Sequence, residues 1–165
     1  MAWTTPKTDF ASETLTSSQM NAIGANLEYL FAPNSSYYEP DTTNYTTSSG
    51  TEVSIDNTLG NFRHQIDTDG GNVMVFGTLV FSNSSAGANT IFNIEVDGAD
   101  AFPATSAFVE QQDGAGYEKV ITFLYVIEGL SDGTHTFELK WRVGGGTATL
   151  YASTYQSFFG VARMG

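Results

Sequence analysis

The 165-residue sequence has no cysteine and very few basic residues. Without cysteine there is no disulfide, no thiolate nucleophile and no zinc site built on thiolates. Six lysines and arginines stand against eighteen aspartates and glutamates, which gives a formal net charge of −12. This charge repels the phosphate backbone of nucleic acids, so we expect no nucleic-acid partner. An acidic excess also suits a protein that stays soluble in strong salt, and a halophilic source stays open.

Long apolar stretches are absent as well. No run approaches the ~18 residues that a membrane-spanning helix needs, so we expect no membrane insertion. The first residues, MAWTTPKTDF, lack the charged start and apolar core of a secretory signal. Charged residues make up 15% of the chain, and threonine, serine, asparagine and glycine dominate the polar remainder. This composition favours strands and turns over helices.

One convincing helix signal is present, in residues 1–32. In LTSSQMNAIGANLEYLF, Thr16 and Gln19 have the spacing of a capping box, which predicts a helix that begins near Ser17. Its apolar residues form one narrow stripe, which consists of Met20, Ile23, Leu27 and Leu30. So short a helix, weakened further by Gly24, is unstable alone. It must bury its stripe against its own domain, a second copy or another protein.

The next segment, residues 33–52, is polar and has no sustained period, which predicts a linker or a surface-hugging extension. A helix on such a tether is best explained as an anchor or oligomerisation element. From residue 53 to residue 165 one strand signal follows another, which predicts a β-sandwich head of six to nine short strands, an antiparallel jelly roll. The expected turns are Asp69-Gly70-Gly71, Asp97-Gly98, Asp113-Gly114, Asp132-Gly133 and Gly144-Gly145-Gly146.

Two of the expected strands are apolar on both faces, whereas an antiparallel sandwich usually exposes one polar face to water. In the first strand the two sets are Val73, Val75, Leu79 and Phe81 against Met74, Phe76 and Val80. In the second they are Val120, Thr122, Leu124 and Val126 against Ile121, Phe123, Tyr125 and Ile127. The second faces are covered either by a loop or the N-terminal segment, or by another subunit. The candidates for a subunit interface are Phe76, Phe123, Tyr125 and Phe159.

The stretch THTFELKWRV has a period of two, which places Phe137, Leu139 and Trp141 in the core, while Glu138 and Lys140 face outward. These two charged residues are interpreted as neighbours on a solvated face. The run of three glycines that follows precedes a strand, so it is interpreted as a hairpin turn and not as a phosphate-binding loop.

His135 starts the same strand on its core side, next to Asp132 across a turn. We interpret it as a capping or core histidine, in preference to a metal ligand or a catalytic base. No nucleophile elbow accompanies it, and the only other histidine is His64. The sequence therefore predicts no catalytic residue.

Two acidic turns contain the oxygen ligands that calcium prefers. One offers Asp67, Asp69 and Asn72, and the other offers Asp97 and Asp100. Neither continues into the loop of an EF-hand, so structural turns are favoured, and no metal or cofactor is predicted. A hydrolase would need two convergent carboxylates, and the available ones, Glu95, Asp97 and Glu110, carry no motif.

Two segments resemble known proteins. AWTTPKTDFASETLTSSQMNAIGANLEYL resembles the N-terminal segment of small virion proteins from tailed bacterial and archaeal viruses, the head-fibre or minor tail proteins. GLSDGTHTFELKWRVGGGTATLYA is similar to the closing strands of the jelly-roll modules that follow in such proteins, whose outline is that of the trimeric C1q and tumour-necrosis-factor fold.

The resemblance implies a non-enzymatic virion component, a homotrimeric capsid decoration or head-fibre appendage at the virion surface. Trp3 and the stripe of the predicted helix would dock on the major capsid protein or another virion protein, or would trimerise the N-terminus, with the jelly-roll head outward. An alternative is a tail-fibre or receptor-binding module that recognises a host surface glycan or protein. Aromatic side chains stack well on sugars, and the candidates are Tyr37, Tyr38, Tyr117 and Tyr155.

Overall fold

The computed structural model describes residues 21, 35–36, 43–102 and 108–164. Asn21 is the one described residue of the predicted helix, and its conformation is helical. Several predicted positions lie outside the described residues, namely Trp3, Met20, Ile23, Leu27, Leu30, Tyr37 and Tyr38. In the part that is described, no helix is long and apolar enough to span a membrane.

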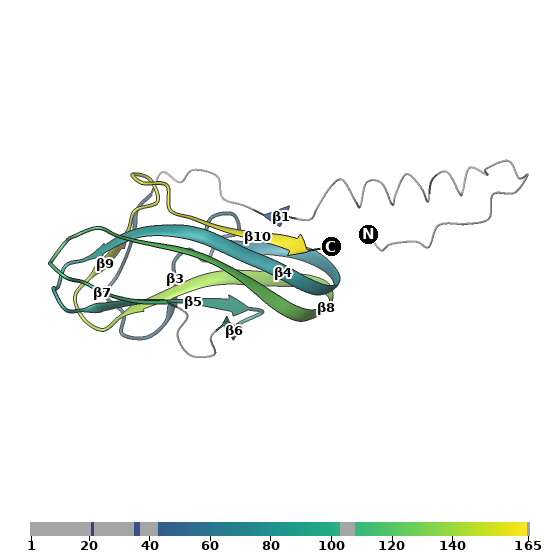
Figure 1. Cartoon of the computed structure of the whole chain (residues 1–165), viewed down its shortest axis with the longest axis horizontal. Coiled ribbons are helices and arrows are strands. Elements are labelled where there is room, and N and C mark those ends of the chain that lie inside the picture. Colours follow the sequence, from purple (N-terminus) through teal and green to yellow (C-terminus); the bar gives the residue numbers. More distant parts are fainter. Residues whose placement is uncertain (1–20, 22–34, 37–42, 103–107, 165) are drawn as a thin grey trace, which may run out of the picture.

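The described residues form ten strands, and every ladder between them is antiparallel (Figure 1). The strands are β1 (Ser35–Ser36), β2 (Tyr45–Thr47), β3 (Val53–Ser54), β4 (Arg63–Asn83), β5 (Asn89–Val96), β6 (Ala99–Phe102), β7 (Phe108–Gln111), β8 (Lys119–Val143), β9 (Ala148–Leu150) and β10 (Phe158–Met164).

Two long strands, β4 and β8, form the centre of the head and pair with each other over nearly their whole lengths. Arg63 lies opposite Glu138 at one end of the ladder, and Phe81 lies opposite Lys119 at the other. The register shifts just after Gly71, near the middle. Each strand therefore contributes one half to each of two layers.

The two layers have different neighbours around this central pair. In the first layer, β10 lies beside the second half of β4, and the first half of β8 lies on its other side. In the second layer, β5 lies beside the second half of β8, and β6 and β7 pair with β5. Figure 1 shows β10 and β4 above and β5 and β6 below. The structure thus confirms the predicted antiparallel jelly-roll sandwich.

Three of the predicted turns are wrong, and two of them lie inside strands. Asp69-Gly70-Gly71 lies inside β4 and Asp132-Gly133 lies inside β8, where the two aspartates face each other in the ladder. Gly70 and Gly133 have φ of 83° and 138°, which lets a strand bend without reversing direction. The head accordingly contains strands of 21 and 25 residues where several short strands were expected.

Of the other predicted glycine turns, one is wrong and one is confirmed. Gly144-Gly145-Gly146 is not a hairpin turn, because the strand after it, β9, pairs with β2 and β4 and not with β8. Asp97-Gly98 is the predicted tight turn, between β5 and β6, with positive φ at both positions. The Asp97-Gly98 signal therefore correctly identified the short hairpin between β5 and β6. The run of three glycines was misidentified, because it connects β8 and β9, which do not pair.

The described part of the expected linker belongs to the sandwich. β2 pairs with β9, and the Tyr45 ring packs edge-on against Phe62 at a centroid distance of 5.5 Å. The Val143 backbone N–H donates to the carbonyl of Ser49. Residues 43–52 therefore contact the sandwich through strand pairing, a ring contact and a backbone hydrogen bond.

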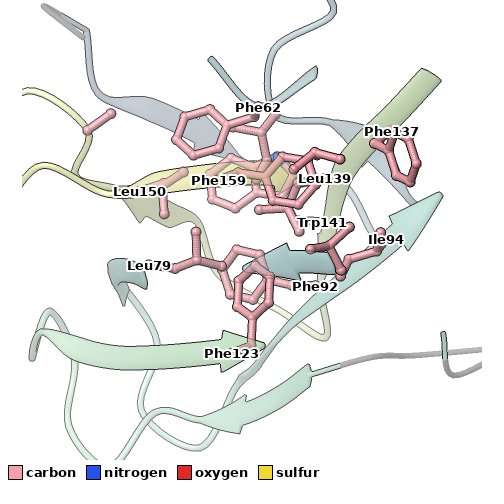
Figure 2. Packing of buried hydrophobic residues seen from close by; sticks show 14 of the residues in the cluster. Phe62, Leu79, Phe92, Ile94, Phe123, Phe137, Leu139, Trp141, Leu150 and Phe159 are labelled. Carbon is pink, nitrogen blue, oxygen red and sulfur yellow. The ribbon is translucent and has the colours of Figure 1, made fainter. Parts of the chain in front are cut away.

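The core lies between the layers and includes the predicted residues Phe137, Leu139 and Trp141, each exposed at 1% or less. Phe92 joins the layers, because its ring stacks on Trp141 at 6.1 Å and meets Phe81 edge-on at 5.0 Å. Figure 2 shows Phe92 and Trp141 among the side chains that converge from strands of both layers. Burial of one such side chain contributes about 1.5–3 kcal/mol, so this cluster holds the layers together.

Candidate functional site

The outward surface of the first layer is apolar. Val120, Leu124 and Val126 of β8 are exposed at 63%, 62% and 40%. The sequence period of two explains this arrangement, because the alternate residues of the same strand point into the core. We define the outer apolar face by Met74, Phe76, Val80, Val120, Leu124, Val126 and Phe158.

The outer apolar face is continuous across three strands. Val80 lies opposite Val120 in the ladder, and Phe76 lies opposite Leu124. On the other side the Phe76 ring lies over Gly160 of β10, where an added Cβ would come within 2.6 Å of the ring. Residues between these positions on the same face are threonines and not charged groups. Such a surface can pack against a partner without desolvating a charge.

The predicted interface residues fall into two groups. Phe76 is half-buried on the outer apolar face, and Tyr125 is half-buried on the inner side of β8. Phe123 and Phe159, at 6% and 0% exposure, are core residues and offer almost no surface to a partner. They flank Gly77 in the ladder and approach each other across it at 6.3 Å. The sequence showed two apolar faces but not which of them points inward.

The outer apolar face ends at an open strand edge. Residues 119–130 of β8 pair with β4 on one side, and no described strand pairs with their other side. An exposed apolar edge strand is a site where another chain can associate.

Both histidines are buried and hydrogen-bonded, at different places. His135 Nδ1 lies 2.6 Å from Asp97 Oδ2, so its orienting carboxylate is Asp97 and not the expected Asp132. Its Nε2 lies 3.0 Å from the carbonyl oxygen of Ser131. Two acceptors call for a proton on both nitrogens. The bond with Asp97 raises the pKa of His135 above 6.5, against the effect of burial and with help from the Ser131 carbonyl.

This geometry excludes His135 as a base toward Ser131. The Ser131 hydroxyl lies 3.4 Å from Nε2, which gives a serine, a histidine and an aspartate in the order of a catalytic triad. However, Nε2 donates its proton to the Ser131 carbonyl and therefore has no lone pair with which to accept the hydroxyl proton. The arrangement fixes the Asp97-Gly98 turn to β8, as expected for a capping histidine.

The pKa of His64 is shifted in the opposite direction from that of His135. It is 1% exposed, and its Nε2 lies 2.8 Å from the carbonyl oxygen of Phe159. Burial lowers its pKa below 6.5, although bonds to the backbone of Phe159 and Asn61 oppose the shift. It is therefore a neutral core histidine at neutral pH.

The two histidines should titrate on opposite sides of pH 6.5. The raised pKa of His135 means that its stabilisation is complete below pH 6.5 and is lost as the pH rises through the higher folded value. The lowered pKa of His64 means that its contribution is present above pH 6.5 and is lost as the pH falls through the lower folded value. NMR titration of the imidazole carbons resolves both, and His135→Gln should remove the higher transition. Two transitions on the same side of 6.5 would contradict this assignment.

The carboxylates considered as calcium ligands bind protein donors. Asp67 accepts a hydrogen bond from Thr134, Asp69 pairs with Arg163, and Asn72 accepts one from Gly129. The Asp97 carboxylate is engaged in the bond with His135. Each of these four side chains thus already has a protein partner.

One further acidic group lies on the outward surface of the second layer. Single carboxylate oxygens of Glu52, Glu95 and Asp100 lie within 4.8 Å of one another. Protein donors serve this group as well, because Asn93 Nδ2 lies 2.6 Å from Asp100 and 3.3 Å from Glu52, and Lys140 Nζ lies 3.0 Å from Glu95. Each of the three carboxylates thus has at least one protein donor.

The carboxylates considered for a hydrolase do not all converge. Glu95 and Asp97 line one surface cleft, whereas Glu110 lies on β7, with its carboxylate 3.2 Å from Lys119 Nζ. Asp97 is already bound by His135 and by the backbone N–H of Thr136, and these bonds lower its pKa below 3.8 despite the opposing effect of burial. The pair therefore offers no free general acid.

Comparisons with protein-family models and with curated proteins find no match. Among solved structures, a chain in the structure of infectious bursal disease virus Gt strain is 15% identical, with a TM-score of 0.48. The match covers 80% of this chain and 37% of the viral chain. Eiger TNF from S. frugiperda is 11% identical at 0.48, covering 81% of this chain and 94% of that chain. Murine APRIL is 14% identical at 0.47, covering 79% and 98%. Similarity at these identities concerns the fold alone.

Proposed function

We propose that the chain is a structural subunit that assembles into homotrimers through its outer apolar face and serves as a capsid decoration or head-fibre appendage of a tailed virus. The observation that carries the proposal is the outer apolar face itself. A chain of net charge −12 keeps one uncharged surface, with three large aliphatic side chains exposed, next to an open strand edge. Surfaces of this kind mark interfaces between proteins.

A second copy suits this surface better than a loop of the same chain. The face and the open edge of β8 adjoin but point in different directions, so the edge of one copy can meet the face of the next. Repetition of such a contact around a threefold axis closes a ring and leaves no copy unpartnered. The resemblance of the C-terminal strands to jelly-roll modules of trimeric appendages supports three copies.

The N-terminal segment supplies the proposed attachment. Its resemblance to virion proteins and its single apolar stripe support docking on a major capsid or other virion protein, which places the head outward at the particle surface. The competing role is a receptor-binding module for a host glycan or protein. Tyr117 and Tyr155 favour that role, because their rings are exposed at 66% and 50%.

Leu27→Asp should release the protein from particles that carry it without unfolding the head. The substitution places a charge in the middle of the predicted stripe, where burial against a partner would leave it unpaired. Particle occupancy is measured by quantitative gel analysis after sedimentation, and the near-ultraviolet circular dichroism of the free protein reports the head. Glu28→Gln, next to it and off the stripe, is the control. Wild-type occupancy of the Leu27 variant would show that this helix is not the anchor.

A further inference from the structure

The loop between β9 and β10, residues 151–157, is fastened to one end of the outer apolar face. Both strands lie on the side of β4 that faces away from β8, and Figure 1 shows the loop, in yellow, between them. Its first residue, Tyr151, donates its backbone N–H to the carbonyl of Val80 at 2.8 Å. Its last residue, Ser157, accepts the backbone N–H of Val80 with its hydroxyl oxygen, also at 2.8 Å. Both ends of the loop are therefore bound to Val80, a residue of this face.

Two tyrosine rings of this loop adjoin the outer apolar face. The hydroxyl oxygens of Tyr151 and Ser82 are 2.9 Å apart. Ser82 is two residues after Val80 in β4, so its side chain points to the same side of the sheet as that of Val80. The Tyr155 ring meets the Tyr151 ring edge-on, with 5.5 Å between the ring centroids. This pair of rings therefore extends the outer apolar face beyond Val80.

The loop holds Tyr155 in position before any partner binds. Ser157 donates both its backbone N–H and its hydroxyl to the Tyr151 carbonyl, at 3.2 and 2.9 Å, which closes the loop on itself. Gln156 has a φ of 53°, a left-handed conformation that is unusual for a residue with a side chain. Tyr155 is nevertheless 50% exposed. A partner that covers this ring orders few further groups, and preorganisation of this kind favours tight binding.

The hydroxyl of Tyr155 has no hydrogen-bond partner among the described residues, whereas that of Tyr151 is bound to Ser82. The open edge of β8, residues 119–130, has a complementary need, because the backbone groups on its free side pair with no described strand. Such groups must find partners when another chain covers them. A tyrosine combines an apolar ring with a hydroxyl that can both donate and accept. Tyr155 therefore matches the aliphatic side chains and the backbone of this edge.

Two strands separate Tyr155 from the open edge of its own chain, since its loop lies on the far side of β4 and the edge on the far side of β8. We propose that Tyr155 anchors assembly by binding the open β8 edge of a second copy. Its ring packs there on exposed aliphatic side chains such as Val120 and Leu124, and its hydroxyl bonds to the backbone. This contact rests on the proposed homotrimer and specifies one of its interactions. Of the two exposed tyrosines, only Tyr117 then stays open to a glycan.

The test is the dissociation of the full-length assembly on dilution, measured by sedimentation velocity in molar salt. Tyr155→Ala should raise the concentration at which half of the assembly dissociates at least about thirtyfold, because buried tyrosines are among the residues that dominate interfaces. Tyr155→Phe, which keeps the ring and loses the hydroxyl, should give a smaller rise. Tyr117→Ala, the control, removes a ring that is 66% exposed and lies over Gly114 of its own loop, and should change nothing. Circular dichroism melting curves check that each variant is folded.

The outcomes separate the role of Tyr155 from the assembly itself. A wild-type assembly that Tyr155→Ala leaves unchanged would overturn the role of Tyr155 while the homotrimer stands. Equal weakening by Tyr117→Ala would also overturn it, and a Tyr155→Phe variant that dissociates like the wild type would overturn the bond to the strand edge. A wild-type protein that is monomeric at every concentration would instead refute the homotrimer, and the anchor with it. A large effect of Tyr155→Ala, an intermediate effect of Tyr155→Phe and none of Tyr117→Ala support the proposal.

Discussion

Leu124→Asp should turn the proposed trimer into a monomer, whereas Leu59→Asp should leave it assembled. The two leucines are matched, with side chains exposed at 62% and 59%, but only Leu124 lies on the outer apolar face. A carboxylate at position 124 would be buried at every copy of the interface without a partner, and its desolvation opposes association. At position 59 the same carboxylate stays in water.

The measurement is the native mass by light scattering. One chain has a mass of 17.7 kDa, so the wild-type protein should be about three times heavier and the Leu124 variant should match a single chain. Each copy carries a net charge of −12, so both low and molar salt are needed, because high salt screens the repulsion between copies. A monomeric wild-type protein in both conditions would refute the assembly. A Leu124 variant that remains trimeric would place the interface elsewhere.

Gly77→Ala should destabilise the fold by about 3 kcal/mol, a large part of the stability of a typical domain. An added Cβ would lie 2.5 Å from the backbone carbonyl oxygen of Phe158 and 2.9 Å from the ring of Phe123. The ring can move by rotation, but the carbonyl belongs to the ladder between β4 and β10 and cannot. The change therefore strains the centre of the first layer.

Urea unfolding measures this effect, with Gly145→Ala as the control. Gly145 has no positive φ, and the nearest atom to its added Cβ is 4.0 Å away, so this change should alter stability by less than about 1 kcal/mol. The slope with denaturant should be the same for both variants and the wild type, because the surface exposed on unfolding is unchanged. Equal midpoints for the two variants would show that the layer relaxes around position 77.

Side-chain alternation is the part of the fold that the sequence predicts well. The period of two in THTFELKWRV places Phe137, Leu139 and Trp141 in the core, and the structure confirms all three. The doubly apolar pattern of residues 73–81 and 120–127 predicts a second apolar surface, which the structure contains. Alternation does not show which set points inward, and this is why Phe123 and Phe159 were expected at an interface and lie in the core.

What the sequence does not predict depends on contacts between distant residues. Asp-Gly pairs mark backbone positions with unusual φ, but whether the chain reverses or only bends there depends on the partner strand. The carboxylate that holds His135 is Asp97, 38 residues away, although Asp132 is nearer in the chain. The same holds for the surface cleft that Glu95 and Asp97 line, since two of its other residues, Arg63 and Glu138, meet only through the ladder of β4 and β8.

The shared central strands also determine how the molecule can form and come apart. The closest partners in the ladder of β4 and β8, Phe81 and Lys119, are 38 residues apart in sequence, and every further pair is more distant. The long loop must close before its residues gain any stabilisation from strand pairing. This topology therefore favours slow folding that begins at the Phe81–Lys119 end of the ladder. Because the same two strands run through both layers, neither layer can detach while the other remains intact. The head should therefore unfold as one cooperative unit.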